Sequence, residues 1–220
     1  LGDVYKRQDQ LNTLSDSLGR DSDGLADMGK DLQDRARAAM FSLGATYPEL
    51  SGYYPQPKGL LFPAFLSVQN LSGIYSPFTI EANYNSAMVS YNLPFTICHE
   101  LSHLRGFMQE EEANFIGFLA CVNADDTAFN YSGYLLGWIY ATNELYEVDY
   151  DTFEEIYNRL SDNVKADLSA NSSFWKRYDS KVAEVSGQIN DHYLKANGQN
   201  DGIKSYDRMV DLMITWFRSK

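Results

Sequence analysis

The feature that most constrains this chain is the segment His99-Glu100-Leu101-Ser102-His103, which has the H-E-x-x-H spacing of helices that bind zinc. Residues four positions apart lie on one face of an α-helix, so the imidazoles of His99 and His103 can reach one metal ion. Glu100 lies beside them, where its carboxylate can accept a proton from a water molecule on that ion. Because so short a pattern also arises by chance, its interpretation depends on the surrounding sequence.

The residues around this segment predict a largely buried helix. Pro94 suits the first turn of a helix, where its missing N–H costs no hydrogen bond. Gly106 lets the chain turn after the helix. Two histidines and a carboxylate on a buried helix need polar partners, and a bound metal ion supplies them. The apolar positions of the predicted helix are Phe95, Ile97, Cys98, Leu101 and Leu104.

A catalytic zinc ion usually has three protein ligands and one position left for water. The acidic run Glu110-Glu111-Glu112 follows and begins a second apolar helix over residues 113–122. Helical spacing places Glu112 on one face with Phe115, Ile116 and Leu119, so we expect this face to point inward and Glu112 to be the third ligand. Glu110 and Glu111 are expected to complement the positive end of the helix dipole. Glu112 itself could also serve only that purpose.

The stretch HELSHLRGFMQEEEANFIGFLAC resembles zincin-type metallopeptidases of the gluzincin kind, in which a ligand glutamate follows H-E-x-x-H on the next helix. The triplet Glu112-Ala113-Asn114 is similar to the E-A-N helix of several such families. More closely, the chain resembles the bacterial domain-of-unknown-function 3810 family from about Tyr47 to Arg218. The similar segments include YPELSGYYPQPKG, GIYSPFTIEANYN, PFTICHELSHLRGF, YSGYLLGWIYATN and YLKANGQNDGIKSYDRMVDL.

The motif and the resemblance together imply a zinc peptidase with His99, His103 and Glu112 as ligands of Zn²⁺. Glu100 would take a proton from zinc-activated water and pass it to the leaving amine of a peptide or protein substrate. One alternative is a zinc-containing, non-catalytic binding or sensor domain of the cell envelope, and another is a vestigial fold without a metal. An intact Glu100 argues against the first, because a structural site needs no base, and the complete ligand set argues against the second.

A zinc hydrolase also needs a donor for the oxyanion that develops on its substrate. The loop-forming pairs Asn197-Gly198 and Asp201-Gly202 precede Tyr206, which makes Tyr206 the candidate for this second catalytic role. Tyr193 and Arg208 are further candidates. For each of them, ordinary packing or surface exposure is the alternative.

The first eight residues, LGDVYKRQ, look like translated adapter sequence from metagenomic reads. We therefore expect residues 1–8 to be a sequencing artefact, residues 9–46 to be an N-terminal helical segment, and residues 47–220 to be a zincin-like metallohydrolase domain, all within a single domain. The resemblance implies membrane helices before this domain, hence a membrane-anchored protein with the domain outside the cytoplasm. No apolar run here reaches the ~20 residues of a span, so this chain itself is expected to be soluble.

Composition excludes some classes of function. The formal net charge of -12 and a pI near 4.6 argue against nucleic acid as a partner, because phosphate binding needs clustered lysine and arginine. The two cysteines, Cys98 and Cys121, are too few for a disulfide framework and are expected to be buried free thiols.

The fold class expected is mainly α (α+β), a zincin-like helical domain with a small β-hairpin and an edge strand beside the H-E-x-x-H helix. The hairpin is predicted over residues 73–83, where two β-prone runs flank Ser76-Pro77. Residues 78–83 are the candidate edge strand to which a substrate backbone would pair. Further helices are predicted over residues 25–43, 131–147, 151–161, 180–196 and 205–218.

Overall fold

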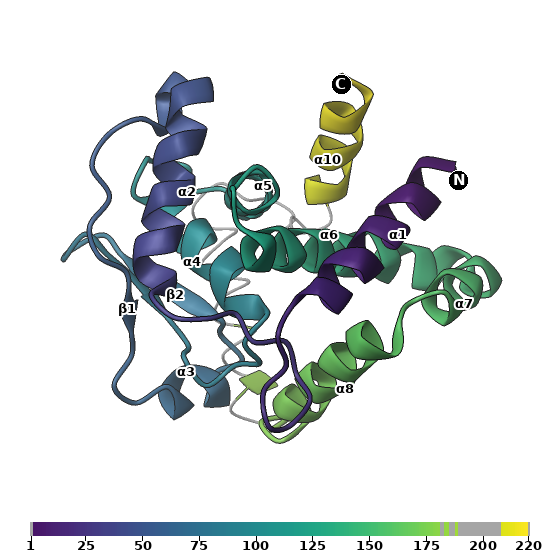
Figure 1. Ribbon diagram of the computed structural model, residues 1–220. Coiled ribbons are helices and arrows are strands. Elements are labelled where there is room, and N and C mark those ends of the chain that lie inside the picture. The colour runs from purple at the N-terminus through teal and green to yellow at the C-terminus, as the bar shows by residue number, and fades with distance from the viewer. Residues whose placement is uncertain (1, 181–182, 185–187, 189–207, 220) are drawn as a thin grey trace.

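The computed structural model describes residues 2–180, 183–184, 188 and 208–219 (Figure 1). Helices predominate and one small sheet accompanies them, which confirms the mainly α (α+β) class. The helices are α1 (Gly2–Ser17), α2 (Leu32–Thr46), the 3₁₀ turn η1 (Pro48–Leu50), α3 (Ala64–Val68), α4 (Asn92–His103), α5 (Glu110–Val122), α6 (Thr127–Val148), α7 (Tyr150–Asn158), α8 (Asp162–Lys176) and α10 (Arg208–Arg218).

The sheet has the strand order β1-β3-β2, with β1 (Lys58–Gly59), β2 (Gly73–Ser76) and β3 (Glu81–Tyr84). Strands β2 and β3 form the predicted antiparallel hairpin, in which Gly73 lies opposite Tyr84 and Ser76 opposite Glu81. Strand β1 pairs in parallel with the other side of β3. The sheet therefore ends at β2, which has no second neighbour among the described strands.

Helices α4 and α5 form the centre of the molecule, with α2 and the sheet on one side and α6 on the other (Figure 1). Pro94 lies in the first turn of α4, as predicted. After α4, Gly106 has a φ of 88°, a left-handed conformation that glycine adopts without strain. The chain then reverses and α5 packs along α4.

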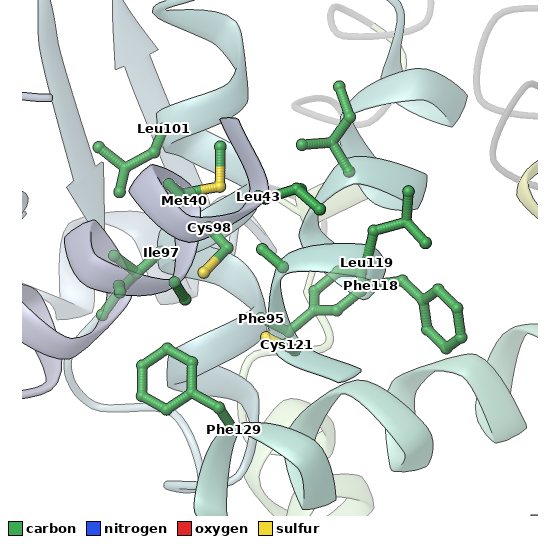
Figure 2. Close-up of a cluster of buried hydrophobic side chains, with 14 of the residues drawn as sticks. Met40, Leu43, Phe95, Ile97, Cys98, Leu101, Phe118, Leu119, Cys121 and Phe129 are labelled. Carbon is green, nitrogen blue, oxygen red and sulfur yellow. The ribbon is translucent and has the colours of Figure 1, made fainter. Parts of the chain in front are cut away.

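The core between these helices is apolar and closely packed (Figure 2). Cys98 of α4 and Cys121 of α5 are both buried and free, as expected. Burial raises the pKa of the Cys121 thiol, which keeps it protonated and makes it a poor metal ligand. The side chains around the two thiols include Met40, Leu43, Phe95, Ile97, Leu101, Phe118, Leu119 and Phe129.

A second apolar cluster joins α1, α6 and α8, and a buried carboxylate anchors it. Asp167 of α8 is fully buried and accepts hydrogen bonds from Arg20 at 2.8 Å, from the Tyr131 hydroxyl at 2.6 Å and from the Ala26 backbone N–H at 2.9 Å. These contacts tie residues 20–26 to helix α8. The helix predicted over residues 25–43 begins only at Leu32 for this reason, and α8 itself was not predicted.

Helix α1 starts at Gly2, and the buried Gln8 side chain donates a hydrogen bond to the Ile156 carbonyl at 2.5 Å. That residues 1–8 are a sequencing artefact remains a prediction. Among the helices in the described ranges, none is both long enough and apolar enough to cross a membrane.

Candidate metal centre

Helix α4 places the two histidines of the H-E-x-x-H segment together, as predicted. The Nε2 atoms of His99 and His103 lie 3.2 Å apart, and their ring planes are nearly perpendicular at 89°. Both side chains are largely buried. Two bare nitrogen lone pairs this close would repel each other, so the arrangement favours a cation or a proton between them.

The third member of the group is Glu110, from the first turn of α5. One carboxylate oxygen lies 3.3 Å from His99 Nε2 and the other lies 3.8 Å from His103 Nε2. His99, His103 and Glu110 each offer one ligand atom, and these atoms all lie within 4.8 Å of one another. The group could therefore hold a metal ion.

The separations are compatible with a small metal ion. Tetrahedral ligands bonded at about 2.0–2.1 Å lie about 3.3 Å from one another. The two Nε2 atoms lie 3.2 Å apart and one Glu110 oxygen lies 3.3 Å from His99 Nε2, which is close to that separation, whereas the 3.8 Å distance to His103 Nε2 runs to the other Glu110 oxygen. Two imidazoles and one carboxylate are also the ligand types of many catalytic zinc sites, which keep a fourth position for water.

Glu112, the ligand predicted from sequence, is not in this group. Its side chain is exposed, whereas Glu110 faces the histidines. Two positions along a helix turn the side chain by about 200°, so Glu110 and Glu112 project from opposite sides of α5. Glu111 is buried but lies 3.9 Å from Arg208 and is also outside the group. The prediction of Glu112 was wrong because a run of three glutamates does not reveal the rotation of the helix.

The face of α5 that meets α4 carries Glu110, Asn114 and Gly117, spaced by four and three residues. A Cβ on Gly117 would lie 3.3 Å from the His99 backbone nitrogen, so this glycine allows the two helices to approach closely. Gly117 is the one sequence signal related to this packing, but it identifies Glu110 only once His99 is known to lie opposite it. Glu110 lies two turns before it on the same face.

Neighbouring groups orient both imidazoles. His103 Nδ1 lies 2.7 Å from the carbonyl oxygen of Phe107, which leaves Nε2 of this ring free to ligate. Asn114 lies beside His99, although His99 Nδ1 and Asn114 Nδ2 make no well-aligned hydrogen bond. An Asn114 amide oxygen that accepted a hydrogen bond from His99 Nδ1 would orient the His99 ring, as the Phe107 carbonyl orients that of His103.

The charges in the site work on the two imidazoles in opposite directions. Burial opposes the charge of His99, but the hydrogen bond and negative charge of Glu110 outweigh it and raise the pKa of His99. Burial, helped by the neighbouring His99, lowers the pKa of His103 to about 4. Of the two imidazoles, His99 is thus the one whose surroundings favour the protonated form.

Glu100 lies beside the ligand group without belonging to it. Its Oε1 is 4.0 Å from His99 Nε2, and its side chain is only 5% exposed. Its Oε2 has no hydrogen-bond partner in the described part of the chain. Burial raises the pKa of Glu100 to about 8. An isolated buried carboxylate is costly, and a nearby cation would offset that cost and favour the ionised form.

Strand β2 borders the site. The ring of Tyr75 on β2 lies 6.0 Å from the ring of His103, centroid to centroid. The expected edge strand at residues 78–83 was misplaced by several residues, because residues 77–80 form the turn and β3 is the central strand. The edge that lies beside the H-E-x-x-H helix is β2.

The proposed oxyanion donor Tyr206 and the alternative Tyr193 lie outside the described residues. Arg208, the remaining candidate, is exposed at the start of α10, and its Nη1 is 3.9 Å from Glu111 Oε1. Arg208 thus pairs with Glu111 of α5, which does not belong to the ligand group.

Comparison with known proteins assigns the chain to a family whose activity is not described. The family model described as a protein of unknown function (DUF3810) matches residues 4–214. No curated protein and no solved structure matches the chain.

Proposed function

The chain belongs to the DUF3810 family, and from the geometry of its site we propose that it is a zinc-dependent hydrolase that cleaves peptide bonds. The observation that carries this proposal is the position of Glu100 relative to His99, His103 and Glu110. Three groups converge as ligands, while a fourth buried carboxylate lies next to them and outside the group. A structural zinc site usually has four protein ligands and needs no adjacent base.

The chain's own residues can be assigned roles in this reaction. His99, His103 and Glu110 would hold the ion, and the Phe107 carbonyl would keep His103 in the tautomer that ligates through Nε2. Zinc, when bound, lowers the pKa of water and polarises a carbonyl group. Glu100 would accept a proton at its carboxylate and later donate it to the leaving amine. The position of Glu100 suits both steps, because its carboxylate lies 4.0 Å from His99 Nε2, beside the ligand group and outside it.

The sheet supports a peptide as the substrate. The outer side of β2 has no partner among the described strands, and its Tyr75 lies beside His103. An extended peptide can pair with such an edge through its backbone, whatever its side chains are. A peptide bound in this way would pass along the H-E-x-x-H helix.

The resemblance to the family supports one further part of the proposal, namely that the full-length protein is anchored in a membrane with this domain outside the cytoplasm. Fractionation of the full-length protein tests it. Recovery with membranes, and cleavage by protease added to intact cells, would support anchoring with that orientation, whereas recovery in the cytosol would contradict it.

Hydrolysis of a diverse peptide library, followed by mass spectrometry, tests the activity. We expect zinc-loaded wild-type protein to cleave peptides and Glu100→Gln to lose about 10²–10⁴-fold in rate, the usual contribution of a general base. Zinc content should stay at the wild-type level in Glu100→Gln, because Glu100 is not a ligand. Glu112→Gln, a matched change at the exposed glutamate, should keep full activity. Equal rates in Glu100→Gln and wild type, or no cleavage by zinc-loaded wild type, would contradict the proposal.

A further inference from the structure

Alternate residues of strand β2 face helix α4. Successive side chains of a strand point to opposite sides, so Gly73 and Tyr75 share one face. On this face Tyr75 lies against His103. Gly73 lies against Glu100, because a Cβ built on Gly73 would be 2.3 Å from Oε1, 2.7 Å from Cδ and 2.8 Å from Cγ of Glu100. The Glu100 carboxylate thus occupies the place that a side chain at residue 73 would fill.

The backbone gives no reason for a glycine at this position. Gly73 is not among the residues with a positive φ, so an L-residue could adopt its conformation. Glycine also weakens a strand relative to alanine, because it loses more conformational freedom on folding. The close approach of Glu100 is therefore the physical account of glycine at residue 73.

A larger residue at position 73 would require the Glu100 side chain to shift. That side chain is buried, and Oε1 already lies 4.0 Å from His99 Nε2 on the side of the metal ligands. A methyl group on Gly73 would push the carboxylate away from the strand and change its position relative to His99. Misplacement of a reacting group by about 1 Å can cost about 10²-fold in rate.

We propose that Gly73 is a positioning residue for the base, and that its missing side chain creates the space which holds the Glu100 carboxylate between strand β2 and the metal ligands. This inference rests on the proposed hydrolase function. It also explains how an edge strand can lie directly against the base, so that a peptide paired with β2 would be held next to Glu100.

Gly73→Ala tests the proposal, with Gly59→Ala as its matched control. Gly59 on β1 lies opposite the same residue of β3, Tyr84, but a Cβ there would come no closer than 3.3 Å to its nearest neighbours, which are side-chain atoms of Ser86 and Tyr84. In zinc-loaded protein we expect Gly73→Ala to lower kcat by about 10²-fold with KM and zinc content nearly unchanged, because the ligands are untouched. Gly59→Ala should keep wild-type kcat. Equal kcat in Gly73→Ala and Gly59→Ala would overturn the proposal.

A thermal-unfolding cycle tests the same contact without any activity. Gly73→Ala should lower the melting temperature when Glu100 is present and should not lower it in a Glu100→Ala background, where the clash is gone. If Gly73→Ala alone fails to fold, recovery of folding in the double variant supports the proposal. The same loss in both backgrounds, or a double variant that does not fold, overturns it. Absence of cleavage by zinc-loaded wild type would instead overturn the hydrolase function, and the cycle would still decide the contact.

Discussion

Replacing Glu110 with alanine should destroy the metal centre, whereas the same change at Glu112 should not. Glu110 contributes the only carboxylate of the group, with its oxygens 3.3 Å from His99 Nε2 and 3.8 Å from His103 Nε2. Loss of a partner that only orients a ligand typically costs about 10–100-fold in metal affinity. Loss of a ligand should cost more, so we expect zinc affinity to fall by at least about 100-fold, or about 2.7 kcal/mol.

A smaller effect works in the opposite direction. Glu110 raises the pKa of His99, so its removal lowers that pKa and weakens the competition between protons and zinc. Measuring affinity at about pH 8 with a competing chromophoric chelator reduces this offset. Glu112→Ala is a close control, because both residues lie in the first turn of α5 and both interact with the helix dipole. Equal losses of zinc affinity in the two variants, or a loss limited to Glu112→Ala, would refute the assignment.

Two further outcomes follow from the groups around the ligands. Zinc affinity of the wild-type protein should fall as pH decreases through the raised pKa of His99. Glu110 favours a proton on the His99 imidazole, and this proton must leave before zinc can bind. An affinity that does not change with pH in chelator competition would contradict this. Asn114→Ala should weaken zinc binding by about 10–100-fold, because Asn114 lies where it can orient His99. Asn123→Ala, which changes the exposed residue at the C-terminal end of the same helix, should leave zinc affinity unchanged. Equal zinc affinities in the two variants would contradict a role of Asn114 in orienting His99.

Local sequence patterns predicted the elements that carry the site. Pro94 and the apolar residues after it predicted α4, and the spacing of His99 and His103 predicted their convergence. The β-prone runs around Ser76-Pro77 predicted the hairpin, because alternation and turn residues act over short distances. The choice between β2 and β3 as the edge strand failed, because it depends on β1, which comes from fourteen or more residues earlier in the chain.

The third ligand shows a different limit. Three consecutive glutamates are equivalent as helix-dipole partners, and the packing of α5 on α4 decides which one faces the histidines. Gly117 records this packing in the sequence, but its meaning depends on knowing that His99 lies opposite. The start of α2 was missed for a related reason, because Asp167 binds the Ala26 N–H across 141 residues of sequence and holds that segment outside the helix.

Anomalous diffraction from a zinc-soaked crystal, recorded on both sides of the zinc absorption edge, tests the metal centre most directly. We expect one strong peak within about 2.0–2.2 Å of His99 Nε2, His103 Nε2 and a Glu110 oxygen, with Glu100 outside bonding distance. A peak coordinated by Glu112, a peak with Glu100 as a fourth ligand, or no peak between the two histidines would contradict the site on which the proposed function depends.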